Sequence, residues 1–73
     1  MKFLNRGDLI RVPQDVQLWR DHKIDGVVQL EHLKLTKQRY GLFNQKLSYG
    51  LAEIIIDGQA WNVDIDDIFE GEI

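Results

Sequence analysis

The chain has 73 residues, which allows one small domain whose core can bury little surface. It has no cysteine and two histidines, so we expect neither a disulfide framework nor a thiolate zinc site. The net charge of −3 hides a division along the chain. Residues 1–46 carry all nine Lys and Arg and five acids, whereas residues 47–73 carry seven acids and no base. A polar partner or a head-to-tail contact between copies would explain this division, and so would solubility alone.

The N-terminal part of the chain predicts two short strands. The segment GDLIRVP, residues 7–13, is rich in branched apolar residues and ends at Pro13, which has no N–H to donate to a sheet. The segment DVQLW, residues 15–19, alternates so that Val16 and Leu18 share one face.

The middle of the chain gives weaker patterns. Residues 20–26 are polar and end in an Asp-Gly turn signal. In residues 27–35, VVQLEHLKL, the apolar alternation changes phase at Glu31 and His32, which predicts a β-bulge or, alternatively, a helical turn. Residues 37–50 mix aromatic residues with glycine, and we expect a loop or a second ribbon there.

The C-terminal hairpin is the most specific prediction. Asp57 and Gly58 are typical of a two-residue type I′ turn. The expected register pairs Ile56 with Gln59, Ile54 with Trp61, and Ala52 with Val63. The face that carries Ala52, Ile54, Ile56, Trp61 and Val63 is therefore predicted to be a core face.

The other face of this hairpin mixes polar and apolar residues. Leu51 and Ile55 have no evident burial site there within a single small sheet. Either the chain bends back over them or a neighbouring subunit covers them. We expect Leu51, Glu53 and Ile55 to lie at a contact between copies.

An acidic segment, DIDDIFE, follows the hairpin at residues 64–70. Asp64 is expected to cap a short helical turn, with Asp66 and Asp67 as solvated acids of its first turn. The spacing lacks the central Gly and the later Glu of a calcium loop. We therefore predict no bound metal and no cofactor.

Short strands separated by turn signals, with little helical periodicity, favour an all-β fold. The sequence predicts one domain over residues 1–73, a small β-barrel with a short helical turn near the C-terminus. The start of the chain lacks the apolar run of a signal peptide, and its longest apolar stretch is too short to cross a bilayer. We expect no membrane contact and an intracellular protein.

Two segments, GDLIRVPQDVQLW (7–19) and LAEIIIDGQAWNVDIDDIFE (51–70), resemble small proteins of marine cyanophages. This resemblance implies a strongly bent, five-stranded Sm-like or SH3-like barrel in the cytoplasm of an infected bacterium. It further implies a homo-oligomeric ring, with a pentamer as one candidate size, and a nucleic-acid role. RNA-binding Sm proteins have an Arg-Gly pair in the last loop, whereas the turn at 57–58 reads Asp-Gly, which argues against RNA binding of that kind.

Few residues could carry catalysis. The chain has one serine, Ser48, and one threonine, Thr36, and no nucleophile-elbow sequence surrounds the serine. A chain this short also has little volume for a pocket that excludes water. We expect no enzymatic activity.

Nucleic-acid binding is the alternative that the central region favours. Residues 34–46 place cations beside aromatic rings, which are the ingredients of a surface for RNA or single-stranded DNA. The candidate residues are Lys34, Lys37, Arg39, Tyr40, Phe43 and Lys46. The acidic C-terminal half would repel phosphate unless it lies far from these bases. Alternatively, Tyr40 and Phe43 pack into the core and the bases form a hydrated rim.

The sequence as a whole favours a non-enzymatic interaction module that forms a ring with copies of itself. Exposed apolar residues, unpaired sheet edges and opposite charges on the two halves support this hypothesis. In it, the LAEIII strand, residues 51–56, serves as an edge that meets an edge of the next copy.

Overall fold

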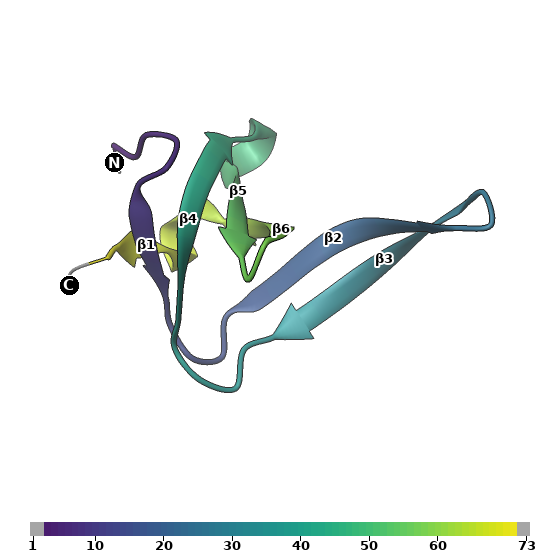
Figure 1. The fold of residues 1–73 in the computed structure, drawn as a ribbon, viewed down its shortest axis with the longest axis horizontal. Coiled ribbons are helices and arrows are strands. Elements are labelled where there is room, and N and C mark those ends of the chain that lie inside the picture. Colours follow the sequence, from purple (N-terminus) through teal and green to yellow (C-terminus); the bar gives the residue numbers. More distant parts are fainter. Residues whose placement is uncertain (1–2, 72–73) are drawn as a thin grey trace.

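The computed structural model describes residues 3–71, which form one antiparallel sheet and two single 3-10 turns (Figure 1). Within these residues the strand order is β3-β2-β6-β5-β4-β1-β7. The elements are β1 (Leu9–Val12), β2 (Gln17–Ile24), β3 (Val27–Lys34), β4 (Arg39–Lys46), η1 (Ser48–Gly50), β5 (Leu51–Ile56), β6 (Gln59–Asp64), η2 (Ile65–Asp67) and β7 (Phe69–Glu70). The all-β prediction is confirmed. The sheet is open rather than closed into a barrel, since β3 and β7 stand at its two ends.

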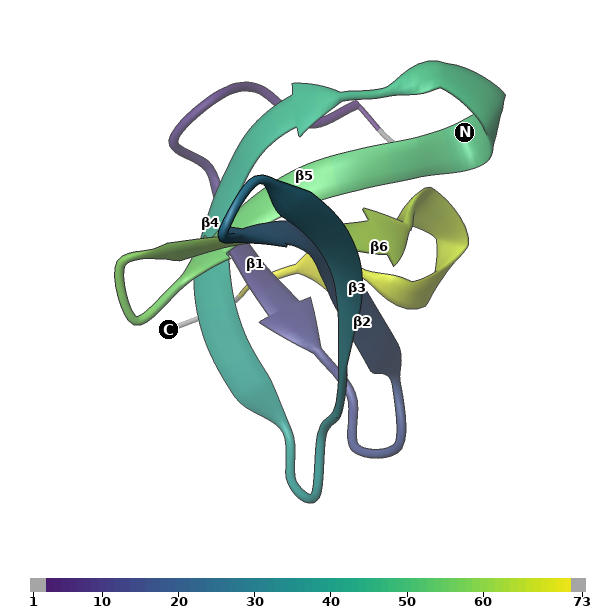
Figure 2. The same ribbon diagram turned by 90° about the vertical axis from the view of Figure 1, so that its right-hand side faces the viewer.

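The shape is that of a curved body with one long projection. Figure 1 shows the β2–β3 hairpin extending away from the other strands, and Figure 2, which looks along it, shows those strands curving around a common centre. The longest dimension is 40 Å, and the radius of gyration is 12.3 Å, compared with roughly 11 Å for a compact chain of this length. The hairpin accounts for this extension. We call residues 21–30 the arm and the remaining described residues the body.

The core lies on the concave side of the body. In β5 the exposure alternates strictly, so that every second side chain is buried, as expected for a strand with one face on a core. The buried apolar residues are Ile10, Val12, Leu18, Leu35, Phe43, Ala52, Ile54, Ile56, Trp61, Val63 and Ile68. The predicted core face of the C-terminal hairpin is thus confirmed.

The predicted register of that hairpin is also confirmed, because Ile56 pairs with Gln59 and each earlier pair follows in step. Its turn residues, Asp57 and Gly58, both have positive φ, at 52° and 76°, as a type I′ turn requires. The predicted cap is present as well. Asp64 Oδ1 accepts a 2.9 Å hydrogen bond from the backbone N–H of Asp66 at the start of η2.

The predicted bulge in residues 27–35 is wrong. Strand β3 pairs with β2 without interruption, from Val27 opposite Ile24 to Lys34 opposite Gln17. The apolar residues of β3 lose their alternation because the strand has no buried face to maintain. The register shift of this sheet lies instead in β4, between Phe43 and Gln45.

Strand β4 occupies the region predicted as a loop or second ribbon, and it pairs with both β1 and β5. Gly41 lies in β4, which pairs with β5. A Cβ atom at this position would be 2.5 Å from the carbonyl oxygen of Ile55, which is closer than real Cβ contacts. Glycine therefore permits the two strands to lie this close together here.

Candidate interaction surfaces

The arm carries apolar residues on both faces and has no core beneath it. All ten of its residues are exposed. Ile24 pairs with Val27 on one face, while Val28 and Leu30 lie on the other. Val28 is 63% exposed and Leu30 is 55% exposed. Exposed apolar side chains on both faces of one ribbon make the arm a candidate interaction surface.

The arm also presents open backbone edges. Among the described strands, β3 has a single neighbour, β2. Strand β2 in turn pairs with β6 at one position only, Trp19 opposite Asn62, before the arm leaves the body. A long edge strand with apolar side chains is a template on which a further strand can pair.

The base of the arm is fixed by a charged group. Arg20 Nε donates a 2.7 Å hydrogen bond to Glu31 Oε2 across the β2–β3 pair, and the Arg20 guanidinium lies 4.5 Å from the ring centroid of Trp61. This hydrogen bond, with a smaller coulombic contribution from Arg20, lowers the pKa of Glu31 below its ordinary value. Arg20 thus contacts both β3 and the core residue Trp61 at the base of the arm.

A second apolar surface lies on the side of the sheet opposite the core. We call Leu9, Tyr40, Leu42 and Ile55 the outer face. Leu42 lies directly opposite both Leu9 and Ile55 in the sheet, so the three form a row across β1, β4 and β5. Leu42 is 45% exposed, Tyr40 is similarly exposed, and the other two are half-buried.

The predicted use of the LAEIII strand as an edge is wrong, because β5 lies between β4 and β6 in the sheet. Leu51 and Glu53 are half-buried. The Glu53 carboxylate accepts hydrogen bonds from the side-chain amides of Asn44 and Gln45, the latter at 3.2 Å. Of the three predicted contact residues, the structure places Ile55 alone among exposed apolar neighbours.

The predicted aromatic and basic residues are not brought together into one surface. Phe43 is 5% exposed and belongs to the core, as the alternative interpretation of the sequence proposed, so its ring is not offered to a base. Tyr40 lies on the outer face. Lys46 ends β4, about 23 Å along the strand from Arg39 at its start.

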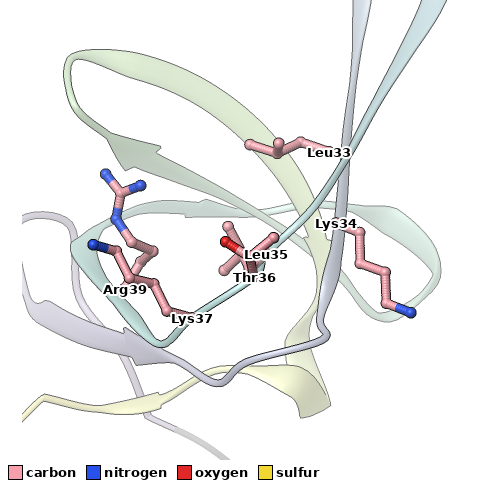
Figure 3. Close-up of a pocket in the computed structure, with 6 residues that line it drawn as sticks. All are labelled: Leu33, Lys34, Leu35, Thr36, Lys37 and Arg39. Atoms are coloured by element: carbon pink, nitrogen blue, oxygen red, sulfur yellow. The ribbon is translucent and has the colours of Figure 1, made fainter.

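Three of the predicted bases do line one pocket, of about 130 Å³ (Figure 3). Its lining residues are Leu33, Lys34, Leu35, Thr36, Lys37 and Arg39. Figure 3 shows Lys37 and Arg39 side by side, whereas Lys34 points away from them. Arg39 also forms an ion pair with Asp57, which offsets one of the positive charges.

Sequence reasoning missed the arm and one loop residue, Tyr49. Tyr49 lies in η1 with a positive φ of 61° and is 99% exposed. Its φ cannot be foreseen from the residue type, since non-glycine residues rarely adopt such values. The sequence does contain one sign of the arm. Residues 27–30 are mostly apolar and follow a turn, but no segment before that turn supplies a buried face with which they could pack.

Within residues 3–71, no three acidic or histidine side chains gather around a common point. In the same part of the chain, no helix has the length and apolar character needed to cross a membrane. Comparison with models of known protein families, with curated proteins and with solved structures finds no match to this chain.

Proposed function

We propose that this protein is a non-enzymatic module that binds further copies of itself. The observation that carries the proposal is the arm, an exposed ribbon that has apolar residues on both faces and a free edge strand. The exposure of Ile24, Val27, Val28 and Leu30 corresponds to roughly 400 Å² of apolar surface, divided between the two faces of the ribbon. A chain of this size also gains stability when copies associate, because its own core is small.

The test is to shorten the arm without changing its turn. Deleting residues 21–24 and 27–30 removes four successive cross-strand pairs and leaves Asp25-Gly26 between Arg20 and Glu31. Every deleted side chain is exposed, so the body should keep its fold. We expect the full chain to have the mass of several copies by light scattering, and the shortened chain to have the mass of one.

Trp61 in the core provides the control in a Trp19→Phe background, since its fluorescence then reports the core alone and should be the same in both proteins. A full chain that stays monomeric as its concentration is raised would contradict the proposal. So would a folded, shortened chain with an unchanged multiple mass.

We regard the body as an opened form of the five-stranded SH3-like or Sm-like barrel. Support comes from the continuous β4–β5–β6 meander, from η2 directly before β7, and from the pairing of β1 with both β4 and β7. Together with the resemblance to cyanophage proteins, this arrangement of strands supports a protein that forms a ring in the cytoplasm of an infected bacterium. A pentamer is one candidate size of the ring.

A second candidate function is the binding of RNA or single-stranded DNA. The grouping of Lys34, Lys37 and Arg39 around one pocket favours it. Such binding to oligo-dT or poly-U should weaken steeply as salt rises, because it depends on phosphate contacts. Lys37→Ala should reduce it, whereas Lys46→Ala removes the same charge at the far end of β4 and serves as the matched control. Equal affinities for both variants would exclude this site.

A further inference from the structure

We propose that the arm of one copy binds the outer face of the next, so that two different surfaces form each contact. This inference rests on the proposed function, self-association, and specifies which parts of the two copies meet. The partner of the outer face is a second copy of this chain. Two separate exposed apolar surfaces are present on one molecule.

The arm cannot cover the outer face of its own chain. The arm continues from the β6 side of the body and projects away from it, as Figures 1 and 2 both show. The outer face lies on β1, β4 and β5, on the other side of β6 in the strand order. Each surface must therefore be covered from outside the molecule if it is covered at all.

The areas fit one contact that uses both surfaces. The face of the arm that carries Val28 and Leu30 exposes roughly 200 Å² of apolar surface and the outer face roughly 300 Å² by the same reasoning. Together with the polar atoms around them, these approach the ~1,000 Å² that a specific interface needs. A contact between two arms would leave the outer face in water, whereas an arm on an outer face covers the outer face and one face of the arm.

The charges beside the two surfaces are also compatible. On the arm, Asp21 lies opposite Leu30 and Lys23 lies opposite Val28, so an acid and a base flank this apolar pair. On the sheet, Arg11 lies opposite Tyr40 in β1 and β4. Glu53 is two positions from Ile55 on the same side of β5. Each surface thus offers both signs of charge to the other.

Two different surfaces per contact have a geometric consequence. A contact that uses the same patch on both copies stops at a dimer, whereas one that joins unlike patches continues from copy to copy until it closes into a ring. Each copy would then give its arm to one neighbour and receive an arm from the other.

The experiment uses two charge-neutral double variants of the full chain. Val28→Glu with Leu30→Lys disables the arm, and the new charges lie opposite Lys23 and Asp21, which supports the hairpin. Leu42→Lys with Ile55→Glu disables the outer face, and the new charges lie opposite each other on β4 and β5. Circular dichroism establishes that each variant is folded.

We expect each double variant alone to be monomeric by light scattering, and an equimolar mixture of the two to have the mass of two chains. The mixture assembles because one variant keeps its arm and the other keeps its outer face. If the outer-face variant assembles like the full chain, or if the mixture stays monomeric, the inference is wrong.

These outcomes are separate from failure of self-association, in which the unaltered chain itself is monomeric. Should the outer-face variant not fold, Leu42→Asn alone replaces it, since that side chain is the more exposed of the two. A mixture of the Leu42→Asn variant with the arm variant is then expected to have the mass of two chains.

Discussion

The arm and the C-terminal hairpin begin from the same local chemistry and end in opposite environments. Each turns on an Asp-Gly pair with positive φ at both residues, 50° and 80° in the arm, 52° and 76° in the C-terminal hairpin. Yet β5 buries every second side chain, while residues 21–30 bury none. Turn chemistry is therefore sufficient to fold the chain back on itself, whereas neighbouring strands decide whether a hairpin acquires a buried face.

The largest expected effect is a difference in the free energy of unfolding between an isoleucine-to-alanine substitution in the C-terminal hairpin and one in the arm. Ile54 is fully buried in β5, and Ile24 is an exposed residue of the arm. Ile54→Ala should lower the free energy of unfolding by about 2–5 kcal/mol, because it leaves a cavity. Ile24→Ala should change it by no more than about 0.5 kcal/mol.

Urea unfolding measures both values, at a protein concentration low enough for the unaltered chain and both variants to be monomeric, because association shifts apparent stability. Equal losses for the two isoleucine variants would mean that the arm is packed as firmly as the body.

Two glycines extend the comparison to the backbone. Gly41→Ala should cost about 1–3 kcal/mol of global stability, because a Cβ there would collide with the Ile55 carbonyl group of β5. Gly26→Ala meets no neighbouring atom but strains a turn residue at φ 80°, at a local cost of about 1 kcal/mol.

We therefore expect Gly41→Ala to shift the global unfolding midpoint, and Gly26→Ala to speed amide hydrogen exchange in the arm with little global effect. A tolerated Gly41→Ala would show that β4 and β5 can separate without loss.

The smallest effect concerns pH at the base of the arm. The Arg20 hydrogen bond lowers the pKa of Glu31 in the folded chain, so the folded state binds this proton less readily than the unfolded state. The stabilisation is complete above the ordinary glutamate pKa and is lost as the pH falls through the lowered value.

Carbon-detected NMR of the Glu31 side chain should give a midpoint below the ordinary one. Glu31→Gln should flatten this part of the stability profile. An ordinary midpoint for Glu31 would exclude the coupling to Arg20.

Local patterns explain what could be predicted from the sequence. The C-terminal hairpin, its register and the Asp64 cap each depend on residues within a few positions of one another, so the turn residues and the alternation fix them. The open sheet and the central position of β5 depend on strand pairings between distant segments, which no local pattern encodes. The same limit explains why the predicted basic and aromatic residues do not form one surface. Phe43 packs into the core, and Arg39 forms an ion pair with Asp57.

The arm could not be predicted from the sequence for a different reason. Amphipathic alternation arises when one face of a strand meets a core, and β3 has no such face. Its apolar residues therefore follow no period, and the phase change at Glu31 predicts a bulge that the strand does not have. A segment with apolar residues on both faces and no core can be recognised only when the rest of the fold is known.

The pairing of β1 with β7 has a consequence for the order in which the molecule folds. It joins Ile10 to Glu70, near opposite ends of the described chain, whereas the arm pairs residues adjacent to its turn. Hairpins of that kind form in about 1–10 μs, while contacts between distant segments bear a larger loop-closure entropy and form later. The hairpin thus presents its open edge while the body is still incomplete, and partly folded chains would meet one another arm first.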